Sequence, residues 1–355
     1  MSSNNAPARE MTFSQAIREA LEQEMARDPA VFVLGQGVDD VKGFYGSTLD
    51  LHKRFGKERC FDTPLSEDAI TGICIGAALA GMRPVNTHQR MDFMLLCLNQ
   101  LVNVAAKSRY MYAGAASIPM VVRGVVGRSW GQGPQHTQSF HSYFMHVPGF
   151  KIFAPATPHA AKGCMISAIR DDNPVLIMEN RMLHGTRGEV PESPYGIPFG
   201  QANVMTSGGD LTLVAISHMV LESLQAAQRL GREKGIAVEV IDPVSLAPLD
   251  METIARSVEK TGRLLVVDNG WINCGASAEI VAQMAERWRG DRGVRVRRLG
   301  FAPVPCPTTK PLENLFYPNA ATIAAAAYAL ITGRDGEWVP DPTPSSEVEG
   351  FRGPF

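Results

Sequence analysis

The chain has 355 residues, and its 34 basic and 36 acidic side chains leave a formal net charge of −2 at pH 7. Because the charges nearly balance, nothing in the composition favours binding to nucleic acid or to an anionic membrane, and we expect small molecules or protein surfaces as partners. The length exceeds that of a usual single domain, so two domains with substantial cores are expected.

The six cysteines are widely scattered and form no C-x-x-C pair, which argues against a zinc site or a redox motif. The first residues lack the apolar segment of a signal peptide, and the best apolar run, residues 69–82, is too short and too rich in glycine to span a bilayer. We therefore expect a soluble, cytoplasmic protein with reduced thiols.

The first half of the chain alternates between strand-like and helical patterns. Residues 1–10 are expected to be a flexible N-terminus, and residues 13–25 form an amphipathic helix with Ile17, Leu21 and Met25 on its apolar side. Further on, strands are predicted at 31–35, 121–125, 151–155 and 174–179, and helices after Pro64 and over 157–170, where Thr157 caps the helix and Pro158 takes its first position. This alternation predicts a parallel sheet covered by helices.

The second half repeats the alternation after a segment rich in Gly, Pro and Ser. Strands are predicted at 211–217, 236–242, 263–268 and 294–300, and helices at 220–234, 250–259 and 276–288. The expected organisation is a first domain over 11–185, a linker over 186–209, a second α/β domain over 210–333 and a C-terminal tail over 334–355.

One acidic residue stands at the start of an unusual helix. A turn containing Pro64 and Ser66 places Glu67 before a run of Gly and Ala. Acids are common in first turns because they favour the helix dipole, so the local pattern supports an ordinary role and a functional role about equally. The helix is apolar nearly all round, which predicts that it lies in the core or at a subunit interface with Glu67 at its mouth.

A glycine-rich segment carries three histidines. Gly131 and Gly133 precede His136, and His141 and His146 follow it. No carboxylate or cysteine completes a recognisable metal-ligand spacing, so we favour a loop that brings one histidine to a cleft, where an imidazole can move protons. The chain also contains no G-x-G-x-x-G or P-loop motif, so the residues alone do not name a reaction.

Several long segments occur in a recognisable order: FDTPLSEDAITGICIGAALAGMRPV, DFMLLCLNQLVNVAAKSRYM, QHTQSF, IPFGQANV and VIDPVSLAPLDMETIARSVEKTGRLLVVDNGW. In this order they resemble the beta subunits of pyruvate, branched-chain 2-oxo acid and acetoin dehydrogenases, which belong to the transketolase superfamily. The similarity covers residues 11–333. It implies a transketolase-type pyrimidine-binding α/β domain with a mostly parallel sheet, followed by a transketolase C-terminal α/β domain.

The resemblance also implies a cofactor and a partner. Enzymes of this family use thiamine diphosphate, which sits between an alpha and a beta subunit in an α₂β₂ heterotetramer. The family's diphosphate motif, G-D-G followed by N-N, is absent here, so the alpha subunit is expected to hold the diphosphate and magnesium. The implied reaction decarboxylates a 2-oxo acid, or cleaves an acyloin, and passes the acyl group to a lipoyl-bearing acyltransferase or another carrier.

Individual residues match positions with known roles in the family. The resemblance places Glu67 at the glutamate that hydrogen-bonds the aminopyrimidine ring, Phe93 at the aromatic that packs against this ring, and His136 near the substrate. Two positions depart from the family pattern in the cofactor-binding region: Gln36 stands where an acid is usual, and Gln89 replaces a methionine under the pyrimidine.

The family further uses mainly backbone oxygens to hold a structural potassium ion. Met120, Ala168, Asp171 and Asn173 fall at these positions, and the alternative is an ordinary helix C-terminus whose carbonyl groups need partners.

Two other functions stay open at this point. One is a split transketolase-like or deoxyxylulose-phosphate-synthase-like ketol transferase, and the other is a non-catalytic scaffold subunit, suggested by Gln36 and Gln89. The polar segment NTHQRMDF, with His88, and the neighbourhood of Trp130 suggest in addition that the substrate pocket differs from that of the usual family member.

Overall fold

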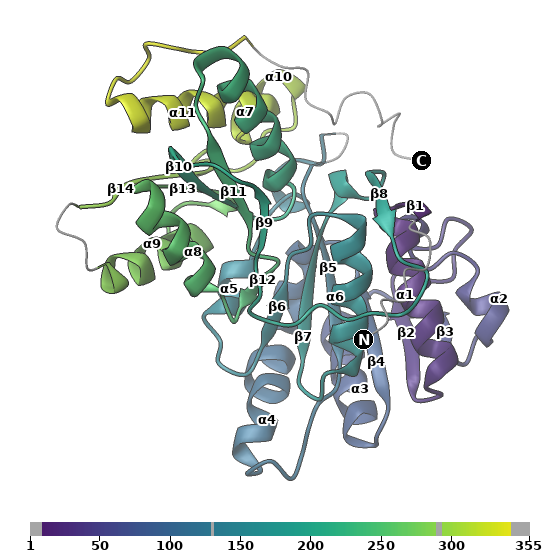
Figure 1. The fold of residues 1–355 in the computed structure, drawn as a ribbon. Helices are drawn as coiled ribbons and strands as arrows, with labels where there is room; N and C mark the ends of the chain where they lie inside the picture. The colour runs from purple at the N-terminus through teal and green to yellow at the C-terminus, as the bar shows by residue number, and fades with distance from the viewer. Residues whose placement is uncertain (1–8, 129–130, 289–292, 342–355) are drawn as a thin grey trace. The chain divides into compact units, whose positions relative to one another are not determined.

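The computed structural model describes residues 9–128, 131–288 and 293–341, so Trp130 and most of the expected C-terminal tail lie outside the described residues. The chain divides into two compact units: Met1–Gly127 with Tyr143–Phe199, and Arg128–Ser142 with Gly200–Phe355. Figure 1 shows the first unit mainly in purple and blue and the second mainly in green and yellow. In this division the segment 128–142, which carries His136, falls in the second unit, and the boundary between Phe199 and Gly200 lies inside the expected linker 186–209.

The first unit is built on a parallel sheet. Its strands are β2 (Val31–Gly35), β3 (Cys60–Asp62), β4 (Arg83–His88), β5 (Val121–Val126), β6 (Lys151–Phe153) and β7 (Val175–Asn180). Within this unit they are ordered β6-β7-β5-β4-β2-β3, and every pair is parallel. All residues of β2, β5 and β7 are buried, as expected where helices cover both faces of a sheet.

The helices of this unit are α1 (Phe13–Arg27), α2 (Leu51–Phe55), α3 (Glu67–Leu79), α4 (Ala106–Met111), α5 (His141–Met145, which begins in the second unit) and α6 (Pro158–Arg170). Short helical turns lie between them: η1 (Phe44–Gly46), η2 (Met91–Cys97), η4 (Gly133–Gln135, in the second unit), η5 (Arg181–Leu183) and a π-helical segment, η3 (Asn99–Ala105). Helices α1 and α6 pack against each other (Figure 1).

The ends of α1 and α6 follow from local sequence. Thr12 and Gln15 form a reciprocal capping box at the start of α1, and the hydroxyl group of Thr157 accepts a hydrogen bond from Ala160 N at 3.1 Å in α6. Pro158 occupies the first position of α6, where no backbone N–H is needed. Both helices, with the predicted apolar face of α1, are confirmed.

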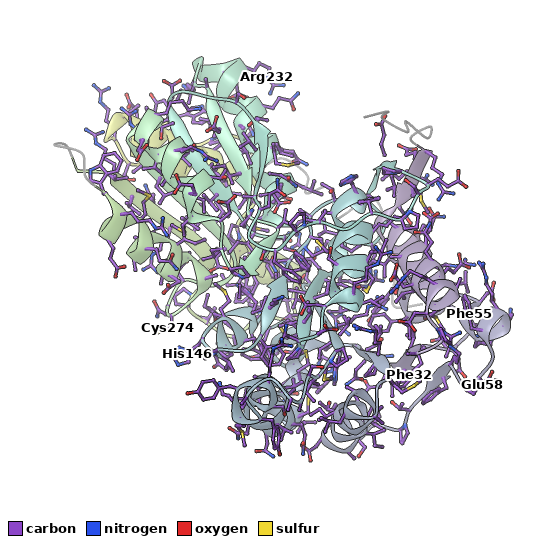
Figure 2. The ribbon with its side chains drawn as sticks, turned by 60° about the horizontal axis from the view of Figure 1, so that its bottom comes forward. Phe32, Phe55, Glu58, His146, Arg232 and Cys274 are labelled. Carbon is purple, nitrogen blue, oxygen red and sulfur yellow. The ribbon has the colours of Figure 1, made fainter. Side chains whose placement is uncertain are left out.

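Aromatic packing adds to the core around β2. Phe32, labelled in Figure 2, stacks on Phe61 of β3 with ring centroids 6.2 Å apart. The contact joins two neighbouring parallel strands on one face of the sheet.

A small two-stranded sheet was not expected. β1 (Arg9–Thr12) pairs antiparallel with β8 (Arg187–Val190). Arg9 and Glu10, assigned to the flexible N-terminus, are therefore in a strand, and so are four residues of the expected linker. The two strands lie far apart in the sequence, and each is too short to show an alternating pattern of its own.

The second unit contains a five-stranded sheet in the order β14-β13-β10-β11-β9, in which only the edge pair of β9 and β11 is antiparallel. The strands are β9 (Asn203–Thr206), β10 (Leu211–Ala215), β11 (Val238–Asp242), β13 (Arg263–Trp271) and β14 (Arg295–Phe301), with the short β12 (Ser245–Ala247) after β11. The helices are α7 (Met219–Lys234), α8 (Met251–Thr261), α9 (Ala276–Arg287), α10 (Lys310–Phe316) and α11 (Ala320–Thr332). The predicted elements of this half are confirmed to within a few residues.

Among the residues that the structure describes, one stretch, Lys310–Thr332, is long and apolar enough to cross a membrane by length and composition. It comprises two helices, α10 and α11, and half of its most apolar part is buried. Helix α11 packs on α7, as a core helix does.

A buried carboxyl group at the end of β11 gives a pH-dependent prediction. Asp242 accepts a hydrogen bond from Val244 N at 3.0 Å, and burial raises the pKa of Asp242 to about 7. The folded state therefore binds a proton more tightly than the unfolded state, and stability is lost as pH rises from about 4 to 7. Asp242→Asn carries no charge, so the stability of this variant relative to the parent should improve by up to roughly 4 kcal/mol over that range.

Urea unfolding of the two proteins at pH 5 and pH 8 measures this change. Asp250→Asn is the matched control in the same unit. Burial alone would raise the pKa of Asp250, but hydrogen bonds from Ala202, Thr253 N and the Thr253 hydroxyl group lower it below its usual value. Asp250 is therefore ionised in both the folded and the unfolded state between pH 5 and pH 8, and the stability of this variant relative to the parent should not change over that range. Equal pH dependence in the Asp242 variant and the parent would contradict the prediction.

Candidate active site

Three neighbouring strands of the first unit end at one edge of the sheet. Gly35 of β2 is aligned with Asp62 of β3 and with Thr87 of β4, so the segments that follow these strands begin side by side. Those segments carry Gln36, Glu67 and Gln89. The carboxyl ends of parallel strands are the usual place for a binding site in an α/β sheet.

Gln36 and Glu67 are in direct contact. The side-chain amide of Gln36 donates to Glu67 Oε1 at 2.9 Å, and its backbone N–H donates to Thr87 O at 3.3 Å. Gly35 makes this approach feasible, because a Cβ there would lie 2.2 Å from Thr87 O. Within the part of the chain that the structure describes, Gln36 is the one hydrogen-bond partner of the Glu67 carboxylate.

Gln89 lies beside the same turn. Its Nε2 atom is 3.0 Å from the place that a Cβ of Gly37 would occupy. Gly37 has a φ of +72°, so glycine relieves both the backbone strain and the crowding by the amide. The structure thus brings together three of the predicted site residues, Gln36, Glu67 and Gln89.

Buried polar side chains of β4 and α3 are hydrogen-bonded to one another next to this edge of the sheet. Asn86 Nδ2 donates to the hydroxyl group of Thr71 at 3.3 Å and lies 3.1 Å from His88 Nε2. Burial lowers the pKa of His88 to about 4, although the nearby Glu67 acts to raise it. At neutral pH the imidazole next to Glu67 is therefore uncharged. Asn86 and Thr71 were not predicted as site residues, because their roles depend on contacts between α3 and β4.

Phe93 lies on η2, which packs against α3, and its side chain is half-buried. Its role as an aromatic partner of the pyrimidine stays a prediction.

His136 lies in the second unit, directly after η4. Gly131 and Gly133 have φ values of +85° and +72°, and a Cβ on either would come within 2.5 Å of Thr308. The hydroxyl group of Thr137 donates to Gly133 O at 2.7 Å and closes the turn. These contacts account for the predicted glycine-rich loop, and His136 is half-buried on it.

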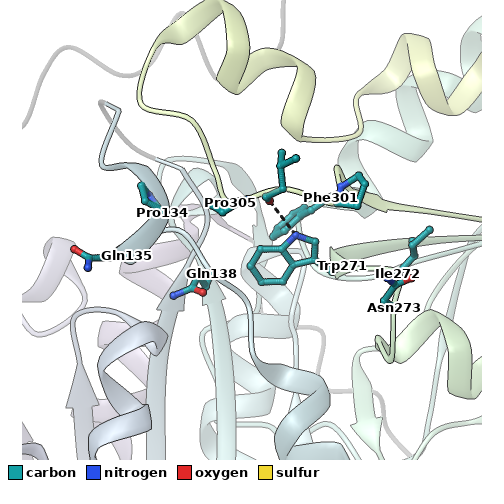
Figure 3. A pocket seen from close by; sticks show the side chains of 10 residues that line it. Pro134, Gln135, Gln138, Trp271, Ile272, Asn273, Phe301 and Pro305 are labelled. Atoms are coloured by element: carbon teal, nitrogen blue, oxygen red, sulfur yellow. Dashed lines mark hydrogen bonds between the residues drawn. The ribbon is translucent and has the colours of Figure 1, made fainter.

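The same loop forms one wall of a pocket of about 490 Å³ (Figure 3). Gln135 and Gln138 line it, together with Trp271 at the end of β13 and Phe301 at the end of β14. The indole N–H of Trp271 donates to Ala302 O at 3.1 Å, which holds the ring in place. The pocket therefore combines apolar walls with amide groups that can make hydrogen bonds.

The proposed potassium ligands lie around the end of α6. Met120 O accepts from Val175 N at 3.0 Å, and Ala168 O accepts from Asp171 N at 3.3 Å. The Asp171 carboxylate pairs with Lys151 and accepts from Asn173 N at 2.8 Å. Although burial acts to raise it, these hydrogen bonds hold the pKa of Asp171 below its usual value.

Arg83 completes this region, because its guanidinium group donates to Ile169 O at 3.0 Å and to Asp171 O at 3.1 Å. Protein groups therefore satisfy these oxygens, as at an ordinary helix C-terminus. The potassium site stays a prediction.

Within residues 9–128, 131–288 and 293–341, no group of three His, Cys, Asp or Glu side chains is arranged to hold a metal ion. The three histidines of the glycine-rich segment have different surroundings. His136 is half-buried and His141 is buried. His146, which is labelled in Figure 2, is exposed.

Comparison with known families assigns most of the chain to two of them. The family "Transketolase, pyrimidine binding domain" matches residues 9–186, and the family "Transketolase, C-terminal domain" matches residues 200–323. Among solved structures, a chain described as "Split gene transketolase, inactive beta4 tetramer" is similar with a TM-score of 0.74 at 22% sequence identity. The structural alignment covers 91% of this chain and 99% of the split-gene transketolase chain. The expected fold class is confirmed.

Sequence relatives are closer. The beta subunit of an acetoin:2,6-dichlorophenolindophenol oxidoreductase from Cupriavidus necator is 43% identical over 92% of this chain and 99% of its own length. The E1 beta-1 subunit of mitochondrial pyruvate dehydrogenase from Arabidopsis thaliana is 40% identical, over 91% of this chain and 90% of its own length. The corresponding subunit from Drosophila melanogaster is 39% identical, over 93% and 92% of the two chains.

Proposed function

This chain belongs to the family of acetoin dehydrogenase and pyruvate dehydrogenase E1 beta subunits, and from that premise we propose that it binds the pyrimidine half of thiamine diphosphate beside Glu67. An alpha subunit would hold the diphosphate and magnesium, because the G-D-G…N-N motif is absent from this chain. The assembly would be an α₂β₂ heterotetramer.

The observation that carries this proposal is the Gln36–Glu67 contact at the sheet edge. Gln36 donates to Oε1 of the carboxylate, and Oε2 has no hydrogen-bond partner within the described residues. A ring nitrogen that shares its proton with Glu67 fits this free position. His88 is neutral at pH 7, so it adds no competing charge next to the ring.

Thiamine diphosphate, when bound, supplies a thiazolium carbon that can lose its proton and attack a carbonyl carbon. Glu67 would hold the proton at the pyrimidine nitrogen and thereby favour the tautomer that acts as a base. Gln36 orients the carboxylate, and the polar chain through Asn86 and Thr71 supports β4 and α3 on either side.

Exposed apolar groups on α3 support the need for a partner. Ile73 is 58% and Leu79 is 54% exposed in the single chain, on a helix that the sequence placed in the core or at a subunit interface. Tyr110 and Met111 of α4 are also exposed. Apolar surface of this kind is typical of a subunit interface, in line with the interface alternative for α3.

The reaction follows from the named relatives. We propose that the heterotetramer decarboxylates a 2-oxo acid or cleaves an acyloin and transfers the acyl group to a lipoyl group or another carrier. His136 would assist proton transfer near the substrate, since an imidazole can both donate and accept a proton.

Reconstitution tests the proposal. The chain is co-expressed with its alpha subunit, thiamine diphosphate binding is measured by calorimetry with magnesium, and the pair is screened with 2-oxo acids, acyloins and ketose phosphates. We expect binding by the pair and turnover of a 2-oxo acid or an acyloin. Binding with turnover of ketose phosphates alone would indicate a ketol transferase instead, and no binding would indicate a scaffold subunit.

A further inference from the structure

The second unit contains a buried histidine–carboxylate pair. His141 Nε2 lies 3.0 Å from Asp268 Oδ1, and the two side chains are 1% and 0% exposed. The other oxygen of Asp268 accepts from Ser277 N at 2.9 Å, in the first turn of α9. Asp268 therefore joins His141 to the N-terminus of a helix, where a carboxylate is favoured.

The hydrogen-bond pattern indicates which ring nitrogen of His141 carries the proton. Both oxygens of Asp268 act as acceptors, so Nε2 of His141 is the donor. Nδ1 is buried and has no hydrogen-bond partner within the residues that the structure describes. The bond to Asp268 is thus the one polar contact that orients this ring.

Glycines clear the space for this pair. A Cβ on Gly270 would lie 2.9 Å from His141 Cε1, and one on Gly275 would lie 2.8 Å from Asp268 Oδ2. A Cβ on Gly300 would lie 2.4 Å from Gly270 O, on the neighbouring strand β14. The backbone of β13 can therefore lie directly against the imidazole only because these positions lack side chains.

The pair stands at one end of the loop that carries His136. Ser139 is attached to β13 as well, since Asn269 Nδ2 donates to its hydroxyl group at 3.4 Å. At the other end the hydroxyl group of Thr137 donates to Gly133 O, and the glycines pack on Thr308. His136 lies between these attachments. Gln138 also lies between them, and it lines the 490 Å³ pocket beside Trp271, here called the Trp271 pocket.

We propose that the His141–Asp268 pair is a positioning device that holds the His136 loop, and with it the loop wall of the Trp271 pocket, in one conformation required for turnover. This role rests on the proposed function, because it acts through His136. A displacement of about 1 Å at a reacting group can lower a rate by about a hundredfold, so loosening this anchor should affect turnover strongly.

The test compares His141→Ala and His141→Gln in the reconstituted alpha–beta pair. Alanine removes the donor, whereas the glutamine amide can place an N–H near the position of Nε2. For His141→Ala we expect amide hydrogen exchange over residues 131–140 to rise about tenfold and kcat to fall at least tenfold, with KM and cofactor affinity changed less than twofold. His141→Gln should recover most of the exchange protection and of kcat.

His146→Ala, which removes an exposed histidine of the same segment, is the control and should match the parent in every readout. Gly270→Ala provides a second route, because its methyl group would displace the His141 ring, and it should reproduce the effect of His141→Ala. Exchange and kcat like those of the parent in both variants would overturn the proposal, as would a general rise in exchange across the whole second unit.

The proposed function and the positioning role of the His141–Asp268 pair can fail independently. If the parent pair turns over no substrate, the proposed function fails, and the exchange over residues 131–140 still decides whether the pair anchors the loop. If the parent is active and the loop loosens without loss of kcat, the anchor exists but has no positioning role, and this inference fails alone.

Discussion

Replacing Glu67 by glutamine is expected to lower turnover by the reconstituted alpha–beta pair by about a hundred- to ten-thousandfold, the usual range for a lost proton-transfer group. Glutamine keeps the shape of the side chain and an oxygen that can accept from Gln36, 2.9 Å away in the parent. It cannot share a proton with the pyrimidine nitrogen in the same way. Steady-state kinetics on the assembled pair, with assembly checked by size-exclusion chromatography, measures the effect.

Asp68→Asn is the matched control for this variant. Asp68 is the next residue of the same first helical turn and is exposed, so its loss changes the charge near the helix N-terminus equally. That variant should keep parental turnover. If Glu67→Gln also keeps it, or if both variants lose it equally, the proton role of Glu67 is wrong.

Replacing Glu179 by glutamine is expected to destabilise the protein by about 3–5 kcal/mol, because it leaves Arg123 as a buried charge without its counter-ion. The two side chains are both 0% exposed, with Arg123 Nε donating to Glu179 Oε1 at 2.6 Å and Nη2 donating to Oε2 at 2.9 Å. Arg123 also donates to the hydroxyl group of Ser47 and lies over the ring of Phe44. Urea unfolding at pH 7 measures the loss.

The pH dependence gives an independent check on this pair. Burial alone would raise the pKa of Glu179, but Arg123 holds it down at about 2. The stabilisation is therefore complete above about pH 4.5 and is lost as pH falls towards 2, so the parent and the variant should converge in acid. Persistence of the full difference in stability at low pH would argue against the ion pair as its source.

Two further variants complete the comparison. Glu10→Gln removes the acid of an exposed pair, whose partner Arg187 is 3.7 Å away, and should cost less than about 1 kcal/mol. Adding Arg123→Met to Glu179→Gln removes the stranded charge and should recover part of the lost stability, as a double-mutant cycle would show.

Local sequence was sufficient for most of the secondary structure. Thr12 with Gln15 and Thr157 with Pro158 define the starts of α1 and α6, because a capping side chain acts on backbone groups two or three residues away. The buried strands β2, β5 and β7 appear as apolar runs for an equally local reason. The local pattern also placed Glu67 at the start of a helix and His136 on a glycine-rich loop, and both positions are confirmed.

Contacts between segments that are distant in the sequence could not be predicted from local sequence. Gln36 and Glu67 are 31 residues apart and meet because β2 and β3 end at the same sheet edge, while His141 and Asp268 are 127 residues apart. The pairing of β1 with β8 and the exposure of Ile73 on α3 likewise depend on how distant segments pack. The amino-acid sequence by itself determined where helices and strands begin and which residues could carry chemistry, since those depend on neighbours along the chain. Only the tertiary structure decided which of these residues touch, because sheet order and helix packing bring together side chains whose local patterns are independent of each other.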